Sequence, residues 1–499
     1  MNPSPPAIVV TLPARTVADA RRQMEEARTS GADLLEIRFD RFDAEELGRV
    51  DQLFPNPLPM VATLRSRAEG GEGPDDPETR VRVLGGLARH PFRWIDVELA
   101  RDFPAAEALL RPGVRGLIVS SHSPTGVREP EWSRLLRQTV PRGAVRKVVV
   151  AASVGQLLHE LIPALPPPGE SALVALTTGP SGPLLRAWSR RFGFPLVYAS
   201  LAERAEGASP PPVEPSQIPV DRLRTYLGAD GNPPLFAIVG HPLAHSRSPA
   251  LHARWMRELG QVGLYVALDF ESDREFVDSI PSLVEGGFRG LNITHPLKQV
   301  ALELASRVGP GAVACGVANT LSLGAEEVEA ENTDLVAILR RFEELESSGR
   351  WDGSSVGVIG AGGAARATLA AARSLGVEAY VWARRPQASE VLAREFGANA
   401  ARDAGRARPT LVVHATLMGM AAGGSPSLPD LNWLRPGVHT VDWVYAPEDP
   451  IVRLTADKAG ATYEDGSRLL VYQAAASYGI WWGEGPPPEQ ISAALEGVP

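Results

Sequence analysis

The stretch VRKVVVAAS, residues 145–153, is an apolar segment of the kind that forms a buried β-strand, but Lys147 lies inside it. A strand that is covered on both faces is nearly all apolar. Burying an ammonium group is costly unless it is paired or gives up its proton. A lysine near the start of a strand can also extend to solvent. Other residues of the chain therefore have to show whether Lys147 is a surface lysine or a functional one.

Seven further apolar segments lie before residue 202, and helical patterns separate them. The eight predicted strands cover residues 7–12, 34–40, 60–65, 94–99, 116–122, 145–153, 171–179 and 195–201. Alternating strands and helices predict parallel strands with helical crossovers. Eight even repeats favour a (β/α)8 barrel, and a doubly wound open sheet is the alternative.

Unusual polar residues gather where these predicted strands end, which is where the active site of a (β/α)8 barrel lies. They are Glu36, Arg38, Arg65, His122, Lys147 and Arg186. We expect the three arginines to lie beside Lys147 and to grip a substrate carboxylate. A buried amine in such a mouth is typical of enzymes that form a Schiff base, so we predict that Lys147 attacks a ketone.

Residues 5–225 resemble the type I 3-dehydroquinate dehydratases. The likeness rests on EIRFD (36–40), TLRSRAEGG (63–71), SSHSPTG (120–126), Lys147 and GPSGPLLR (179–186). It implies that Lys147 forms an imine with 3-dehydroquinate, that His122 is the general acid and base, and that Glu69 orients His122. It also implies that the substrate is bound by Glu36, Arg38, Arg65, Arg186 and Gln217. The family's S-A-P-G-Q is VEPSQ (213–217) here, with Val213 and Ser216 in place of serine and glycine.

Length, charge and cysteine content limit the class of protein. A chain of 499 residues predicts two to four domains. The net charge of −9 gives no general basic surface, so we expect no nucleic-acid partner. The single cysteine, Cys315, excludes disulfide scaffolds, and we predict no metal site. No apolar run is long enough to span a bilayer, and no signal peptide is recognisable, so we expect a cytoplasmic enzyme without a membrane partner.

A new strand–turn–helix pattern begins at residue 234, after a stretch (226–236) that is rich in Gly, Pro and Asn and is predicted to be a linker. Residues 234–256 place Ser246 and Ser248 at the start of a helix, where polar side chains form either caps or a binding rim. NITHPLKQ (292–299) contributes Thr294 and Lys298, and ENTDL (331–335) contributes Asp334. A lysine and an aspartate that meet in a cleft can relay a proton.

The stretch SSVGVIGAGGAARATLAAARSLG (354–376) is an apolar strand, a glycine-rich turn and an alanine-rich helix. Gly360, Gly362 and Ala365 fit the dinucleotide-binding fingerprint. The next predicted strand ends in Arg384 and Arg385, where an NAD site carries an acidic residue. Two arginines favour a 2′-phosphate, so we predict NADP as the cofactor.

Residues 234–499 resemble the shikimate dehydrogenases. The matching stretches are GHPLAHSRSP (240–249), NITHPLK (292–298), VANT (317–320), NTD (332–334), GAGGAAR (360–366), DWVYAPEDP (442–450) and GSRLLVYQAA (466–475). The resemblance implies Lys298 and Asp334 as the catalytic pair. The implied substrate-binding residues are Ser246, Ser248, Thr294, Asn319, Asp334, Gln473 and the nearby Tyr445. The implied cofactor-binding residues are Gly360, Ala361, Gly362, Gly363, Ala364, Ala365, Arg384, Arg385, Thr416, Met418 and Gly466.

Three positions depart from this second family. His414 replaces the asparagine of N-A-T-x-x-G-M, Ala383 lies in the predicted 2′-phosphate loop, and Leu335 replaces a common glycine. These changes affect the expected cofactor affinity more than the reaction type.

The two resemblances name consecutive reactions. We therefore predict an α/β chain with a (β/α)8 barrel (1–228), a substrate domain (234–338, completed by 468–499) and a Rossmann-type NADP domain (339–467). The predicted enzyme dehydrates 3-dehydroquinate to 3-dehydroshikimate and reduces it to shikimate. The alternatives are a Schiff-base aldolase barrel fused to a quinate-type dehydrogenase, and an inactive scaffold.

Overall fold

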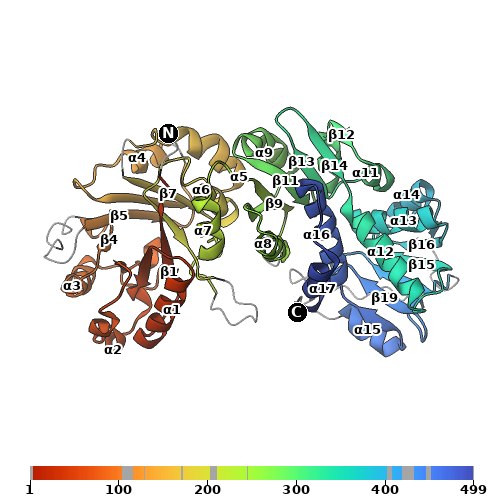
Figure 1. Ribbon diagram of the computed structural model, residues 1–499, viewed down its shortest axis with the longest axis horizontal. Coiled ribbons are helices and arrows are strands. Elements are labelled where there is room, and N and C mark those ends of the chain that lie inside the picture. Colours follow the sequence, from red (N-terminus) through yellow and green to blue (C-terminus); the bar gives the residue numbers. More distant parts are fainter. Residues whose placement is uncertain are drawn as a thin grey trace. The chain divides into compact units, whose positions relative to one another are not determined.

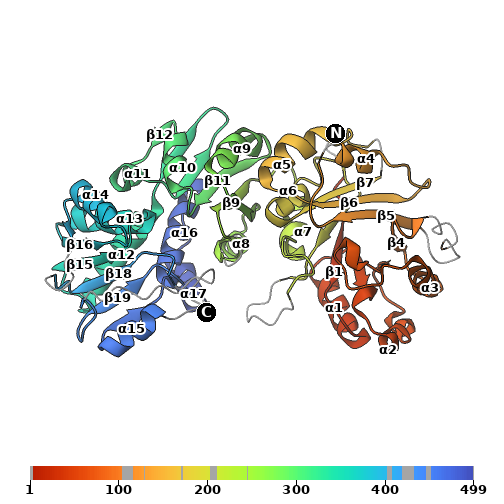
Figure 2. The same ribbon diagram turned by 180° about the vertical axis from the view of Figure 1, so that it is seen from behind.

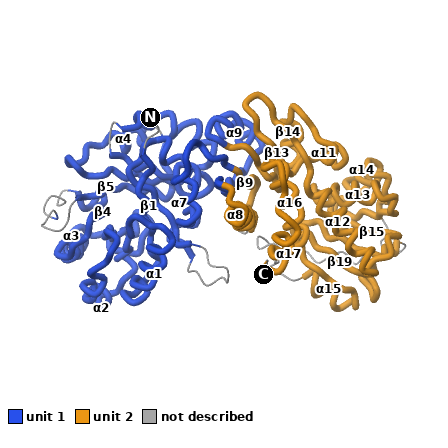
Figure 3. Tube along the Cα trace, viewed as in Figure 1, with its two compact units in different colours: residues 1–235, 262–287 blue, residues 236–261, 288–499 orange. Residues whose placement is uncertain are grey.

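The computed structural model describes residues 4–103, 109, 116–128, 130–169, 172–202, 211–243, 246–401, 407–418, 432–445 and 451–497. The chain divides into two compact units (Figure 3). Unit 1 contains residues 1–235 and 262–287, and unit 2 contains residues 236–261 and 288–499. Within the described ranges, no helix has both the length and the apolar character that a membrane crossing requires.

Unit 1 is built on one sheet whose strands all run parallel, in the order β7-β6-β5-β4-β3-β2-β1-β8. The strands are β1 (Ala7–Leu12), β2 (Leu34–Arg38), β3 (Met60–Thr63), β4 (Trp94–Glu98), β5 (Gly116–Ser123), β6 (Val145–Ala151), β7 (Leu173–Thr178) and β8 (Leu196–Ala199). β1 pairs with both β2 and β8, so the sheet curls into a nearly closed barrel (Figures 1 and 2). The predicted barrel is confirmed, because each predicted apolar run became one strand.

Helices follow most of these strands. They are α1 (Val17–Thr29), α2 (Ala44–Leu47), α3 (Pro77–Leu87), α4 (Glu131–Arg137), α5 (Val154–Gln156), α6 (Gly182–Ala187) and α7 (Val220–Gly228). Short helical turns are η1 (Phe39–Arg41), η2 (Val50–Leu53), η3 (Arg67–Glu69), η5 (Leu157–Leu161), η6 (Ile162–Ala164) and η7 (Gly179–Ser181). Unit 1 also contains β10 (Leu264–Asp269) and α9 (Asp273–Glu285).

The barrel interior has an apolar layer below its polar mouth. Val9, Val61, Ile118, Val174 and Leu176 belong to one buried cluster of inward-facing side chains. Parallel pairing then fixes which polar residues are neighbours, since it places Thr11 beside Glu36 and Ser120 beside Lys147. The sheet register therefore brings together residues that are far apart in the sequence.

Unit 2 contains two further sheets. In the first, the consecutive strands β9-β11-β13-β14-β12 belong to this unit, with β13 antiparallel to both β11 and β14. Its strands are β9 (Leu235–Gly240), β11 (Phe288–Ile293), β12 (Arg307–Val308), β13 (Thr320–Leu323) and β14 (Val328–Glu331). The helices α8 (Ser248–Glu258), α10 (Lys298–Leu304) and α11 (Pro310–Cys315) belong to this part of the chain.

The second sheet of unit 2 is parallel, in the order β17-β16-β15-β18-β19-β20. This is the 3-2-1-4-5-6 order of a Rossmann fold. Its strands are β15 (Ser355–Ile359), β16 (Glu378–Trp382), β17 (Asn399–Ala400), β18 (Leu411–His414), β19 (His439–Asp442) and β20 (Thr462–Glu464). The remaining helices are α12 (Thr333–Ser347), α13 (Gly363–Leu375), α14 (Pro386–Phe396), α15 (Ile451–Ala459), α16 (Ser467–Trp482) and α17 (Pro488–Gly497).

The predicted linker at residues 226–236 is too long. Helix α7 continues to Gly228 and strand β9 begins at Leu235. Leu227 and Leu235 are both buried, and this apolar burial extends the regular structure from both sides into the Gly- and Pro-rich stretch.

Candidate active sites

Lys147 lies inside the barrel, where two carboxylates and an aromatic ring surround its amino group. Its Nζ is 3.4 Å from Glu36 Oε1 and 3.2 Å from Asp96 Oδ2. The same nitrogen lies 3.9 Å from the centre of the Tyr198 ring, a distance at which a cation is attracted to the ring face. Lys147 is only 4% exposed. It therefore does not extend to solvent.

Glu36 is itself held by neighbouring hydroxyl groups. Thr11 donates to one carboxylate oxygen at 2.8 Å, and Thr63 donates to the other at 2.9 Å. Gln217 Nε2 donates to Thr11 Oγ1 at 3.2 Å. A continuous chain of hydrogen bonds therefore connects Gln217 to Lys147 through Glu36.

Arg65 is the centre of a buried network of charges. Its guanidinium donates to Asp96 at 2.8 Å, to Ser120 at 3.0 Å, to Glu98 at 3.1 Å and to Glu69 at 3.2 Å. Charge-assisted bonds of this kind are the strong ones in proteins. Both terminal nitrogens of Arg65 therefore donate to the chain's own acceptors and hold the carboxylates of Asp96, Glu98 and Glu69.

The charge state of Asp96 follows from this network. Burial by itself would raise the pKa of Asp96, but the nearby charges of Arg65 and Lys147 outweigh it and lower the pKa to about 2. Asp96 is therefore ionised at neutral pH. Its carboxylate holds the lysine in a fixed direction.

His122 and Glu69 form a pair at the barrel mouth. Glu69 Oε2 lies 3.1 Å from His122 Nδ1 and also accepts the backbone N–H of His122 at 2.9 Å. Burial, followed by the charges of Arg65 and Lys147, lowers the pKa of His122 well below its usual value. Burial raises the pKa of Glu69 to about 7. With Nδ1 directed at Glu69, the Nε2 atom of a neutral His122 is left to exchange a proton with a substrate.

The partner of Arg38 is Asp40. Its guanidinium forms two parallel bonds of 2.8 Å with Asp40, and Asp40 also accepts the backbone N–H of Arg65. Burial opposes the charge of Arg38, but the bonds to Asp40 raise its pKa.

Arg186, at the end of α6, is 2% exposed and is anchored to the backbone. It donates to the carbonyl oxygens of Tyr198 at 3.2 Å, Thr177 at 2.8 Å and Gly182 at 2.5 Å. Its Nη2 atom lies 3.4 Å from Glu214 Oε2. Burial lowers the pKa of Arg186.

The expected arrangement of the arginines is wrong in one respect. The groups that contact the amino group of Lys147 are Glu36, Asp96 and Tyr198, whereas Arg65 reaches it only through the shared Asp96. Side chains alternate between the two faces of β4, so Asp96 and Glu98 both point into the barrel. The sequence reasoning missed these two carboxylates, although WIDVEL shows acidic residues with a period of two.

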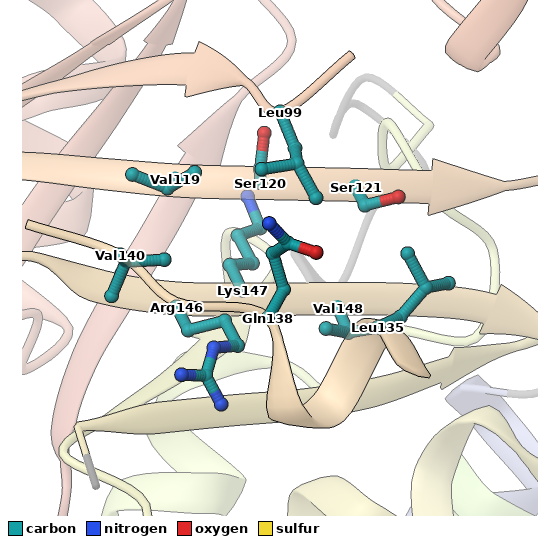
Figure 4. A pocket seen from close by; sticks show the side chains of 10 residues that line it. All are labelled: Leu99, Val119, Ser120, Ser121, Leu135, Gln138, Val140, Arg146, Lys147 and Val148. Atoms are coloured by element: carbon teal, nitrogen blue, oxygen red, sulfur yellow. The ribbon is translucent and has the colours of Figure 1, made fainter. Parts of the chain in front are cut away.

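A small pocket lies on the outer face of the same strands (Figure 4). Its lining includes Val119, Leu135, Gln138, Arg146 and Val148, and also Ser120 and Lys147. Ser120 and Lys147 thus belong both to the lining of this pocket and to the polar network inside the barrel.

In unit 2, Lys298 and Asp334 are in direct contact. Lys298 Nζ is 2.5 Å from Asp334 Oδ2, and Asn319 donates to Asp334 Oδ1 at 2.9 Å. Asn319 is fixed in turn by the backbone N–H and hydroxyl of Thr333. Lys298 begins α10 and Asp334 lies in the first turn of α12. The predicted pair is therefore assembled from two helix starts.

The predicted substrate residues lie on loops and helix starts of the same unit. Ser248 is the first residue of α8, and its backbone N–H lies 3.4 Å from Ser246 Oγ. The guanidinium carbon of Arg247 lies 5.9 Å from the centre of the Tyr445 ring, so Tyr445 is close to this turn.

Two more predicted residues lie near the strand and helix that flank the pair. Thr294 follows β11, and a Cβ atom at Gly240 would lie 2.4 Å from its methyl group, so glycine permits this close approach. Gln473 lies on α16, which packs along α12 and so along the helix that bears Asp334.

The glycine-rich turn joins β15 to α13 beside the catalytic pair. A Cβ atom at Gly363 would lie 2.6 Å from Cδ of Lys298, and one at Gly360 would lie 2.3 Å from the carbonyl oxygen of Ala415. Among the residues that the structure describes, none has an atom within 4 Å of a Cβ atom built at Gly362. Ala361 and Ala364 are half-buried and Ala365 is buried. The turn therefore keeps open space at Gly362, at the start of a helix whose N–H groups attract phosphate.

Arg384 and Arg385 follow β16 and are both exposed. Ala383 N–H donates to Ser389 Oγ at 2.8 Å, which closes the turn into α14. The two guanidinium groups therefore remain available at the carboxyl end of β16, where a 2′-phosphate would lie in a Rossmann domain.

His414, the departure at the end of β18, belongs to a buried chain of hydrogen bonds. Its Nδ1 is 2.8 Å from Asp442 Oδ1 and its Nε2 is 2.6 Å from Thr416 Oγ1. The N–H of Met418 donates to Thr416 Oγ1 at 3.1 Å. Gly466 is buried, and a Cβ atom there would lie 2.4 Å from the carbonyl oxygen of Trp443. His414 thus takes a structural place under the turn that bears Thr416 and Met418.

Lysine is rare in this chain. The sequence contains three lysines, Lys147, Lys298 and Lys458, although it has 50 Lys and Arg residues in all. The first two each contact a carboxylate inside a unit, whereas Lys458 is exposed on α15. Arginine cannot replace lysine as an imine-forming nucleophile, and it holds its proton too tightly for an acid catalyst.

Two family models match the chain. The model for type I 3-dehydroquinase matches residues 8–233, and the model for the shikimate dehydrogenase substrate binding domain matches residues 238–321. A shikimate dehydrogenase (NADP(+)) of Acidiphilium cryptum is 35% identical over 263 residues, which are 51% of this chain and 93% of that protein. The Thermus thermophilus protein of the same description is 35% identical over 259 residues, 52% of this chain and 96% of that protein.

Solved structures are also similar. Shikimate 5-dehydrogenase from Thermus thermophilus, in complex with NADP(H) and shikimate, is 34% identical, with a TM-score of 0.47; the match covers 53% of this chain and 100% of that chain. The dehydroquinate dehydratase and shikimate dehydrogenase from S. pombe is 22% identical, with a TM-score of 0.43, over 100% of this chain and 98% of that chain.

Proposed function

Because the chain belongs to the shikimate dehydrogenase family and carries a type I 3-dehydroquinase domain ahead of that part, we propose that it catalyses two consecutive reactions. The first is the dehydration of 3-dehydroquinate to 3-dehydroshikimate, and the second is its NADPH-dependent reduction to shikimate. The observation that carries this proposal is the placement of the lysines: one lies in each candidate site and the third on the surface.

In the barrel, Lys147 is the nucleophile that forms an imine with the ring ketone. Imine formation makes the adjacent carbon more acidic, so a modest base can remove its proton. His122 Nε2 is that base, since burial keeps the imidazole neutral and Glu69 holds Nδ1. The same nitrogen then returns the proton to the hydroxyl that leaves as water.

The barrel residues around Lys147 divide into two roles. Asp96 and Glu36 direct the lysine. Arg65 holds the carboxylate of Asp96, and Thr11 and Thr63 hold that of Glu36. Arg186 is the proposed partner of the substrate carboxylate, and Gln217 and Arg38 are proposed to contact the substrate from the rim of the mouth.

In unit 2, Lys298 donates a proton to the oxygen of the ketone as it becomes an alkoxide. Asp334 holds the ammonium in place, and Asn319 holds Asp334. Bound NADPH supplies the hydride. The chain's residues fit this cofactor, because Gly362 borders open space at a helix start and two exposed arginines follow the next strand.

The remaining assignments belong to the same proposal. Ser246, Ser248, Thr294, Tyr445 and Gln473 bind the hydroxyl and carboxylate groups of 3-dehydroshikimate. Thr416, Met418 and Gly466 shape the cofactor site. We keep the domain boundaries at 1–228, 234–338 with 468–499, and 339–467. A cytoplasmic location also stays a prediction.

A coupled assay tests the function. The full-length protein is given 3-dehydroquinate and NADPH, and both the loss of NADPH absorbance and the formation of shikimate are followed. We expect one NADPH to be oxidised for each shikimate formed. Absence of shikimate would disprove the bifunctional assignment. Faster oxidation with quinate and NADP than with shikimate and NADP would instead support the quinate-type alternative.

A further inference from the structure

Arg186 offers only one edge of its guanidinium to a ligand. Nε donates to the carbonyl of Tyr198, and Nη1 donates to the carbonyls of Thr177 and Gly182. These three bonds come from the carboxyl ends of β7 and β8 and the start of α6, so the group cannot turn. Any substrate carboxylate that binds Arg186 has to approach Nη2.

That edge already has a partner. Glu214 Oε2 lies 3.4 Å from Nη2, and the Glu214 side chain is 23% exposed where Arg186 is 2% exposed. Glu214 thus approaches the arginine from the solvent side, which is also the side from which a substrate enters a barrel mouth.

The Glu214 carboxylate is held in this position by its own turn. It accepts the backbone N–H of Ser216 at 3.1 Å and the hydroxyl of Ser216. Ser216 fits there because Gly182 has no side chain: a Cβ atom at Gly182 would lie 1.8 Å from Ser216 Oγ. Glu214 and Ser216 both belong to VEPSQ, the segment in which this chain departs from its family's pattern.

We propose that Glu214 occupies the carboxylate-binding position of Arg186 in the substrate-free barrel, so that 3-dehydroquinate binds by displacing it. This inference rests on the proposed dehydratase function. Two carboxylates cannot share one guanidinium edge without repulsion, so the exchange weakens substrate binding. Glu214 thereby lowers the affinity for every ligand whose carboxylate has to reach Arg186.

The test is the Glu214→Gln variant of the full-length protein. Glutamine keeps the size and an acceptor for Ser216 but removes the competing charge. We expect the KM for 3-dehydroquinate to fall at least about fivefold, while kcat stays close to that of the wild type. The reason is that the substrate no longer has to replace a charged hydrogen bond between Glu214 and Arg186. A Glu72→Gln variant is the matched control, because Glu72 lies beside Arg15 and Arg41 and carries the same charge.

A direct binding measurement removes any effect on the chemical step. In a Lys147→Ala background, calorimetry with 3-dehydroquinate gives the Kd with and without Glu214→Gln. The Kd is expected to fall by the same factor as the KM. Binding of the uncharged carboxamide analogue should not change.

Each result has one meaning. An unchanged or higher KM and Kd in Glu214→Gln, with a wild type that turns over 3-dehydroquinate, would overturn the competition by Glu214. A gain of equal size in Glu72→Gln would overturn it too, because the effect would then be one of general charge. A wild type without dehydratase activity would overturn the proposed function itself. A dehydration kcat close to that of the wild type shows that the barrel of the variant is folded.

Discussion

The two lysines of the candidate sites have different surroundings. Lys147 lies in the middle of a strand between two carboxylates and an aromatic face, with 5% of its side chain exposed. Lys298 lies at a helix start, contacts one carboxylate, packs against the glycine turn and is 18% exposed. The first is enclosed by fixed groups, and the second lies at an open edge beside the predicted cofactor.

The difference matches what each lysine has to do. A nucleophile stays attached to its substrate through several steps, so a rigid, closed surround keeps the imine aligned with His122. A proton donor acts once per turnover and has to recover its proton, which access to solvent permits. The same side chain thus performs two kinds of chemistry because its neighbours differ.

Removing the nucleophile should have the largest effect. Lys147→Ala is expected to lower the rate of dehydration of 3-dehydroquinate by at least about 10⁴-fold, which is the usual size of the effect when a covalent nucleophile is removed. Reduction of added 3-dehydroshikimate should not change. Borohydride with 3-dehydroquinate should modify Lys147 alone, and peptide mapping is simple because the chain has three lysines. Modification of Lys298 or Lys458 would contradict the assignment.

Removing the proton donor should have the next largest effect. Lys298→Ala is expected to lower reduction of 3-dehydroshikimate by roughly 10²–10⁴-fold, the range for a lost acid or base, and to leave dehydration intact. Lys458→Ala is the matched control, since Lys458 is exposed on α15. If Lys298→Ala reduces its substrate at the wild-type rate, Lys298 is not the donor.

The burial of Glu69 in the barrel site should also make the free energy of unfolding depend on pH. Burial raises the pKa of Glu69 from 4.5 to about 7, so the folded protein keeps a proton that the unfolded chain has lost. The contribution of Glu69 to the free energy of unfolding is therefore full below pH 4.5 and falls as the pH rises to 7, by up to about 3 kcal/mol.

Glu69→Gln should abolish that loss. Denaturant unfolding at pH 4.5 and 7 measures it, and Glu72→Gln, at an exposed carboxylate, should behave as the wild type does. A fall with pH in Glu69→Gln that is as steep as in the wild type, or steeper, would show that Glu69 is not the group that titrates.

Substitutions in the cofactor site should have a smaller effect than those of the catalytic lysines. Replacing Arg384 and Arg385 by serine is expected to raise the KM for NADPH about tenfold, because charged contacts to a phosphate are lost, and to leave the KM for NADH unchanged. Arg394→Ser, at an exposed arginine of α14, is the control. A double variant that keeps its preference for NADPH would place the 2′-phosphate elsewhere.

The sequence was sufficient for the elements but not for the contacts between them. Each apolar run of the first half forms one strand of the barrel. Eight evenly spaced strand–helix repeats are compatible with few folds other than a barrel, so the fold could be predicted. Lys147 and His122 were predicted because their residue types are unusual at those places in a barrel strand, and Asp334 because the family resemblance pairs it with Lys298. Asp96 was missed: it contacts a lysine 51 positions away, and only the barrel's closure and register bring the two together.

The departures from family patterns were visible in the sequence, but their consequences were not. His414 was expected to disturb the cofactor site, yet it bonds to Asp442 and Thr416 in a buried chain. Glu214 attracted no notice, because its contact with Arg186 depends on how the turn at 214–217 packs against Gly182.

A mixing experiment tests most directly whether each lysine serves its own reaction. Lys147→Ala and Lys298→Ala proteins are given 3-dehydroquinate and NADPH, first separately and then together, and shikimate is measured. We predict almost no shikimate from Lys147→Ala, accumulation of 3-dehydroshikimate with Lys298→Ala, and shikimate from the mixture. A mixture that forms no shikimate, while the wild type does, would contradict the account of two independent lysine sites in one chain.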